Sequence, residues 1–162
     1  MPASLHDRVQ ELRQVFVRAY QSNLCVDTHP YQGVVSCLHT LLKLGKRLVL
    51  ITNKPGRLAI PLLDALGWSD LFEVKLYGDS LSERKPSALP IIHAAHALGV
   101  QLDQCVFIGD TEVDAQAAQA AAITFWAVSW GRAAEGVARG LWGDRAQVLA
   151  RYAFVPEGSR TR

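Results

Sequence analysis

Residues 105–118 read CVFIGDTEVDAQAA, an apolar run that stops at Gly109 and passes at once into an alanine-rich stretch. The apolar run has the composition of a buried strand, and the alanines predict a helix that begins near Thr111. Asp110 and Asp114 therefore stand at the end of a strand and in the first turn of the next helix. A strand joined to a helix by so short a turn is the building unit of parallel α/β sheets.

The same strand-to-helix pattern recurs along the chain. RLVLIT at 47–52 is a short apolar run with β-branched residues, typical of a parallel strand that is covered on both faces. Further strands are predicted at 72–78, 104–110 and 123–128, the last of them the final strand, and helices at 34–44, 57–66, 87–98 and 112–121. This alternation predicts an α/β fold, a three-layer sandwich around a Rossmann-like parallel sheet.

Composition limits the class of partner. The chain has 162 residues, 49% of them hydrophobic, and a net charge of +2 from scattered residues, which fits one compact domain without a basic stripe for nucleic acid or a membrane surface. The N-terminus lacks the order of a secretion signal, and no run reaches the roughly 20 apolar residues of a spanning helix. The three cysteines, without a CxxC pair, suggest reduced thiols. We therefore expect a cytoplasmic protein with a small-molecule partner; its oligomeric state is not set by the sequence.

The N-terminal residues differ from the rest of the chain. Residues 5–22 have apolar side chains at every third or fourth position, which predicts an amphipathic helix. The turn-forming segment DTHPYQG at 27–33 then marks a boundary. We therefore divide the chain into a helix with its linker at 1–30, an α/β core at 31–155 and a polar tail at 156–162.

Open parallel sheets bind ligands beyond the carboxyl ends of their strands. The segments after the strands, expected to face one crevice, are 52–54, 78–80, 109–114 and 129–131. Asp110 and Asp114 offer hard oxygen ligands that suit magnesium. The alternative is that Asp114 only favours the positive end of its helix while Asp110 makes a turn.

Two more polar side chains belong to this edge. Thr52 ends a buried strand, where its hydroxyl and the following amides can bind an anion, and Lys85 stands before Pro86 on an extended loop. Taken alone, such a threonine is more often structural and such a lysine more often solvated. A hydroxyl, a cation and a carboxylate pair at neighbouring strand ends, however, together make a phosphate-plus-magnesium site.

Three segments, LVLITNKP, GDSLSERKPSALP and CVFIGDTEVDAQAA, resemble in this order the second, third and fourth motifs of the haloacid dehalogenase-like (HAD) hydrolases, and most closely those of phosphoglycolate phosphatases. The resemblance implies that Thr52 hydrogen-bonds the transferring phosphoryl group, with Asn53 beside it, and that Lys85 neutralises phosphoryl charge. It also implies that Asp110 ligates Mg²⁺ directly and that Asp114 either ligates it or orients its waters. The activity implied is hydrolysis of a small phosphorylated metabolite through an aspartyl-phosphate.

The same resemblance makes helix 5–22 a remnant of the helical cap that closes over the substrate, whereas a helix simply packed on the core is the other interpretation. The family's first motif, an Asp-x-Asp-Gly-Thr that supplies the nucleophile, does not occur in the 162 residues. A late start site, a real truncation and a degenerate relative are three explanations. We expect little or no activity from this chain alone, and the alternative function is a catalytically dead binding or interaction protein that retains the pocket.

The absent motif also bears on the sheet, which the resemblance predicts to lack its first strand. In the family that strand lies between the strands that end here at Thr52 and Asp110, so its loss either leaves a gap or brings these strands together. We predict direct pairing of 47–52 with 105–109, or otherwise marginal stability and association through exposed edges.

Overall fold

The computed structural model describes residues 5–23, 26, 28–138 and 146–149. Helices and strands alternate after the second helix, as the sequence predicts. In chain order the elements are α1 (Leu5–Ser22), α2 (Val34–Lys43), β1 (Val49–Ile51), α3 (Gly56–Ala65), β2 (Val74–Leu76), α4 (Leu89–Leu98), the 3₁₀ turn η1 (Leu102–Gln104), β3 (Val106–Gly109), α5 (Glu112–Ala120), β4 (Thr124–Val128), α6 (Ala133–Ala138) and β5 (Ala146–Leu149). The predicted polar tail at 156–162 lies outside the described residues, and the predicted domain boundaries stay predictions.

The strands form two parallel sheets. In the first, β1 pairs with β2, and in the second β4 lies between β3 and β5. The segment 123–128 is therefore not the final strand, because the short β5 follows it. The four residues of β5, AQVL, include a single β-branched side chain and no alternation of apolar and polar residues, so the sequence did not predict a strand there.

Within the described residues β1 and β3 are not paired, so the predicted pairing of 47–52 with 105–109 is wrong and the sheet is broken between them. The Lys85 side chain links the two sides of the break. Its Nζ donates to the Ile51 carbonyl oxygen at the end of β1 and to the Asp114 carboxylate on α5. One ammonium group thus connects the end of β1 to the helix that covers the second sheet.

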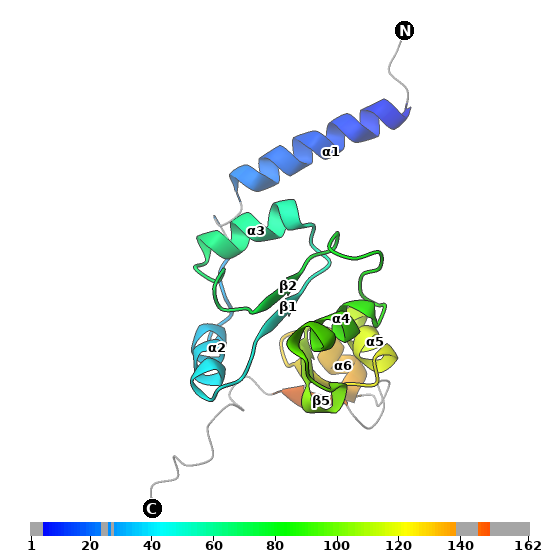
Figure 1. Cartoon of the computed structure of the whole chain (residues 1–162). Helices are drawn as coiled ribbons and strands as arrows, with labels where there is room; N and C mark the ends of the chain where they lie inside the picture. The colour runs from blue at the N-terminus through cyan, green and yellow to red at the C-terminus, as the bar shows by residue number, and fades with distance from the viewer. Residues whose placement is uncertain (1–4, 24–25, 27, 139–145, 150–162) are drawn as a thin grey trace, which may run out of the picture.

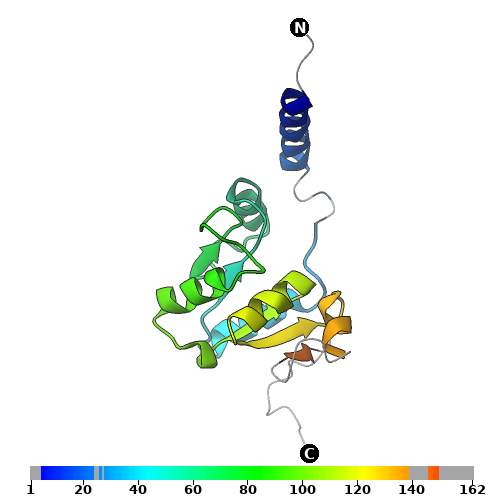
Figure 2. The ribbon, with the colours of Figure 1, turned by 90° about the vertical axis from the view of Figure 1, so that its right-hand side faces the viewer.

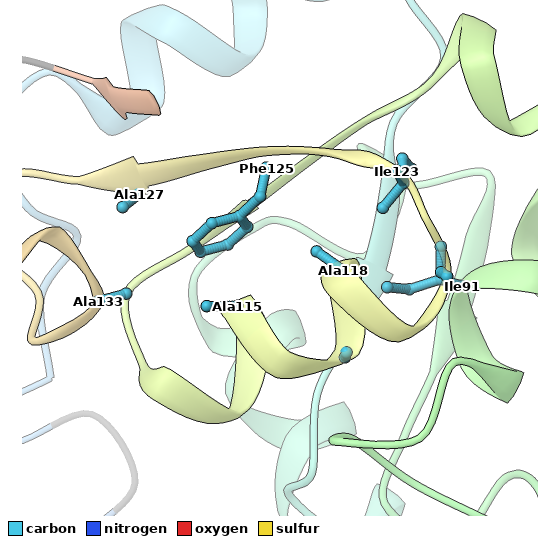
Figure 3. Close-up of a cluster of buried hydrophobic side chains, with 9 residues drawn as sticks. Ile91, Ala115, Ala118, Ile123, Phe125, Ala127 and Ala133 are labelled. Atoms are coloured by element: carbon cyan, nitrogen blue, oxygen red, sulfur yellow. The ribbon is translucent and has the colours of Figure 1, made fainter. Parts of the chain in front are cut away.

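The core lies between β4 and α5, on one face of the second sheet. The Phe125 ring projects from β4 toward α5, where Ala115 and Ala118 present no side chain beyond a methyl group (Figure 3). These small residues allow the helix to lie close to the strand, and Phe125 is only 2% exposed. Burial of one such side chain contributes roughly 1.5–3 kcal/mol.

Helix α4 joins the two sheets. Its residue Ile91 belongs to the core cluster beside α5. At its other end the Leu98 carbonyl oxygen accepts a hydrogen bond of 2.7 Å from the Arg47 guanidinium, which precedes β1 and also bonds Glu73 before β2. Figure 1 shows β1 and β2 beside α3, and α4, α5 and α6 gathered around the second sheet.

Most of helix α1 stands apart from this body (Figures 1 and 2), and its C-terminal end contacts it through Tyr20 and Gln21. None of its residues is buried, and Leu5, Leu12 and Phe16 are 80%, 69% and 63% exposed. The interpretation of α1 as a helix packed on the core through its apolar face is therefore wrong. None of the described helices combines the length and the apolar character needed to cross a bilayer.

Candidate functional site

The carboxyl ends of β1 and β3 open into one pocket of about 350 Å³. All five predicted site residues line it: Thr52, Asn53, Lys85, Asp110 and Asp114. Lys54, Thr111 and Val113 complete the lining. Of the four segments expected at one crevice, 52–54 and 109–114 therefore do face the pocket, whereas 78–80 and 129–131 do not.

A buried ion pair joins the two sides of the pocket. Lys85 Nζ lies 2.5 Å from Asp114 Oδ1 and 2.9 Å from the Ile51 carbonyl oxygen, and the two side chains are only 10% and 6% exposed. Burial raises the pKa of the Asp114 carboxyl, but the hydrogen bonds and charge of Lys85 and the hydrogen bonds from Thr111 outweigh burial and bring the pKa below its usual value. Asp114 is therefore an ionised, tightly held carboxylate.

The second oxygen of Asp114 is bound by Thr111, which caps α5. Asp114 Oδ2 accepts hydrogen bonds from the Thr111 hydroxyl at 2.6 Å and from its backbone N–H at 3.1 Å, while the Thr111 Oγ1 accepts from the Asp114 N–H. This reciprocal pair is a capping box. Asp114 therefore takes part in the start of α5, and it also pairs with Lys85, so that both of its carboxylate oxygens accept hydrogen bonds.

Two glycines hold the acidic side in place by close contact. A Cβ at Gly109 would lie 2.4 Å from Asp114 Cβ, and a Cβ at Gly131 would lie 2.4 Å from the Asp110 carbonyl oxygen. That same oxygen accepts a hydrogen bond of 3.1 Å from the Ala133 N–H. Only glycine permits this approach, so the segment at 129–131 supports Asp110 from behind although it does not line the pocket.

The loop after β1 is fixed in a comparable way. The Lys54 N–H donates to the Thr52 Oγ1 at 3.1 Å, and the Asn53 Nδ2 donates to the Lys85 carbonyl oxygen at 2.8 Å. The Asn53 Oδ1 is buried and has no hydrogen-bond partner among the described residues. Gly78 packs against the Asn53 carbonyl group, where a Cβ would meet the oxygen at 2.1 Å.

Asp110 differs from Asp114 because its carboxylate is exposed and has neither a hydrogen bond nor an ion pair within the described residues. Magnesium usually takes one or two protein carboxylates and completes its shell with water or phosphate oxygens. The described part of the chain contains no group of three or more His, Cys, Asp or Glu side chains that could hold a metal ion. The fit to Mg²⁺ is thus partial: the Asp110 carboxylate is exposed and available, whereas the Asp114 oxygens already accept hydrogen bonds from Lys85 and Thr111.

Lys54 had no predicted role and lines the pocket all the same. Its Nζ donates to the hydroxyl of Tyr20 on α1 and lies 4.9 Å from the centre of that ring. The linker after α1 touches the same end of the sheets, since the Tyr31 and Trp130 rings are 5.3 Å apart. The one sequence signal for a role of Lys54 in the site was its position directly after Thr52 and Asn53. Its contact with Tyr20, 34 residues away, could not be predicted from the sequence.

Comparison with known proteins agrees with this geometry. Residues 3–128 match the profile of the haloacid dehalogenase-like hydrolases. A phosphoglycolate phosphatase of Chromobacterium violaceum is 43% identical over 73% of this chain and 53% of its own length. One from Xylella fastidiosa is 38% identical over 76% and 54%.

A solved structure of a predicted phosphoglycolate phosphatase from Haemophilus somnus 129PT is 31% identical, with a TM-score of 0.76 over 79% of this chain and 57% of that one. The chain thus spans about half the length of the curated relatives it matches. The profile match over residues 3–128 and the strand-end pocket lead to the same conclusion: the chain belongs to the haloacid dehalogenase-like hydrolase family.

Proposed function

We propose that this chain supplies the phosphate-binding part of a HAD-type phosphatase that hydrolyses a small phosphomonoester, with phosphoglycolate, which the relatives' names give, as the substrate. One observation carries the proposal. The Lys85 ammonium, anchored on the Ile51 carbonyl oxygen and the Asp114 carboxylate, lines the same pocket as the Thr52 hydroxyl.

The donor inventory of these two side chains supports phosphate binding. An ammonium group has three N–H donors, and Lys85 uses two of them within the chain. The Thr52 oxygen accepts from the Lys54 N–H, which leaves its own hydrogen free to donate. One N–H and one O–H therefore remain for phosphoryl oxygens in a pocket that Lys85 and Asp114 have already fixed.

Asp110 would hold Mg²⁺, which when bound supplies positive charge for the phosphoryl oxygens. In this proposal Asp114 supports the metal site and does not ligate the metal directly, which is one of the two roles that the family resemblance implies. It is a positioning residue, because it orients Lys85 and the start of α5. Its effect on a metal ion would be indirect.

The 162 residues contain no Asp-x-Asp pair, so the attacking carboxylate of an aspartyl-phosphate mechanism is not among them. In that mechanism a carboxylate oxygen bonds to phosphorus, the ester oxygen leaves as the protonated alcohol, and water then cleaves the acyl phosphate to release phosphate. Loss of a covalent nucleophile costs on the order of ten-thousandfold in rate or more. The chain alone should therefore bind its ligand with little or no turnover.

The same absence favours a second candidate, a binding or interaction protein that retains the anion pocket without catalysis. Hydrolysis of 2-phosphoglycolate or p-nitrophenyl phosphate by the pure chain with Mg²⁺, abolished in Asp110→Asn, would refute the expected inactivity. An in-frame Asp-x-Asp-Gly-Thr upstream of Met1 in the gene would favour the phosphatase. A gene without it would favour the binding protein.

Phosphate binding itself can be measured by calorimetry with inorganic phosphate. Thr52→Val should weaken binding about tenfold, because a hydrogen bond to a charged group is lost. Thr40→Val is the matched control, since the Thr40 hydroxyl bonds the Ser36 carbonyl oxygen on α2 and lies outside the pocket. The absence of phosphate binding by the folded wild-type chain would contradict both candidates.

A further inference from the structure

The pocket contains an unequal distribution of charge. Two lysines and two aspartates line the pocket. One of each, Lys85 and Asp114, neutralise each other in a buried ion pair. Within the described residues Lys54 and Asp110 have no ion-pair partner, and both line the pocket. Within the described residues the Lys54 ammonium is therefore not engaged in a direct ion pair, although the Asp110 carboxylate lines the same pocket.

Lys54 is not a freely solvated side chain. It is half-buried, its Nζ donates to the Tyr20 hydroxyl, and its charge lies 4.9 Å from the centre of the Tyr20 ring. A phenol oxygen and an aromatic face compensate an ammonium only partly, because neither carries a full negative charge. A lysine held in this way retains donors and charge for an anion inside the pocket.

The Lys54 backbone is tied to one of the phosphate donors. Its N–H bonds the Thr52 Oγ1 at 3.1 Å, so the two residues belong to one tight turn, while the Lys54 Nζ is held by the Tyr20 hydroxyl. The pocket volume of about 350 Å³ is at the lower end of the range for small-molecule sites, roughly 300–1,000 Å³. A pocket of this size suits a small ligand that contacts both Thr52 and Lys54.

We propose that Lys54 binds a second anionic group of the substrate, so that the pocket selects small phosphomonoesters that carry a carboxylate, and that Tyr20 of α1 positions Lys54 for this contact. This inference rests on the proposed function, since Thr52 and Lys85 must hold the phosphoryl group. The inference adds that the carboxylate of the substrate is bound by Lys54. Tyr20 is then a positioning residue through which α1 contributes to specificity.

The test compares two ligands of similar size, 2-phosphoglycolate and ethyl phosphate, by calorimetry on the full chain at one Mg²⁺ concentration. The wild-type chain should bind 2-phosphoglycolate about tenfold more tightly, the factor of one charge-assisted hydrogen bond. Lys54→Met should lose most of this preference, with at most about a twofold effect on ethyl phosphate, and Lys54→Arg should restore part of it. Tyr20→Phe, which keeps the ring, should lower the preference by about threefold.

Lys46→Met is the matched control, because Lys46 is an exposed lysine outside the pocket and its loss should leave both affinities unchanged. Thermal unfolding of each variant checks that it is folded. Equal affinity of the wild-type chain for the two ligands would overturn the inference and leave the proposed function standing. An equal loss for both ligands in Lys54→Met would overturn it as well, since Lys54 would then bind the phosphoryl group. Failure of both ligands to bind the wild-type chain would remove the proposed function together with the inference.

Discussion

The Asp114 carboxylate is bound on both oxygens, by the Lys85 ammonium on one side and by Thr111 on the other. It is 4% exposed, and it is the sole buried charged residue in the described part of the chain. Removal of one member of such a pair leaves the other buried without compensation. Asp114 should therefore affect stability as well as the site.

We expect Asp114→Asn to lower the free energy of unfolding by about 3 kcal/mol at pH 7. The pKa of Asp114 is lower in the folded chain than its usual value of about 3.9. Its contribution is therefore present above that pH and is lost as the pH falls through the folded-state pKa. Urea unfolding between neutral and acidic pH should show wild-type and variant stabilities converging at the acidic end.

The control for this prediction is Asp70→Asn, because Asp70 is an exposed aspartate in the loop between α3 and β2. Its substitution should leave both the stability at pH 7 and its acid dependence unchanged. Parallel stability curves for wild type and Asp114→Asn over the whole range would contradict the assignment of the acid dependence to Asp114.

For single residues, the sequence predicted which side chains line the pocket but not which hydrogen bonds they make. Thr52 and Asp110 follow β1 and β3, and the carboxyl ends of strands are where ligand sites of α/β folds form. Lys85, in contrast, lies on the loop before α4 and reaches the pocket through its bond to the Ile51 carbonyl oxygen. The occupation of both Asp114 oxygens depends on side-chain conformations and on a lysine 29 residues away. The contact between Lys54 and Tyr20 depends on where α1 lies, and periodicity carries no information about that.

Among the elements, α1 has an apolar stripe that the core does not cover. Leu12 is 69% exposed on α1, whereas Leu63 on α3 is 6% exposed. Leu12→Ala should therefore change the free energy of unfolding by less than about 0.5 kcal/mol, and Leu63→Ala should lower it by about 2–5 kcal/mol. Chemical denaturation of the two variants compares them directly. A large loss of stability in Leu12→Ala would mean that α1 packs on the core in solution.

The longer elements follow from local patterns, and the described structure confirms the helices predicted at 5–22, 34–44, 57–66, 87–98 and 112–121 to within a few residues. The departures concern contacts between distant elements. The short β5 has no strong strand signal and gains its place by pairing with β4. The break between β1 and β3 could not be read from either strand, because each strand has the composition of a paired one.

On the scale of the whole molecule, the break leaves one edge of β1 and one edge of β3 without a neighbouring strand in the described residues. Val106 and Ile108, on one face of β3, are 45% and 43% exposed. Unpaired edges with apolar side chains favour pairing with another chain. We therefore expect association at micromolar concentrations and above, visible in light scattering coupled to size exclusion.

Ile108→Lys should reduce this association, because a charged residue on an edge strand opposes pairing between chains. The matched control is Ile92→Lys, since Ile92 is 46% exposed and lies on helix α4 rather than on a strand. A wild-type chain that stays monomeric at high concentration would contradict the prediction. The same conclusion would follow if both lysine variants had equal effects.

The Lys85 ammonium touches the end of the first sheet and the helix that covers the second. If its third N–H binds a phosphorylated ligand as proposed, occupancy of the pocket and the alignment of the two sheets become one coupled equilibrium. A ligand that binds only the folded chain stabilises it by mass action, and proteases act on the fraction that opens. The supply of the metabolite would then set the lifetime of this chain in the cell, quite apart from any turnover.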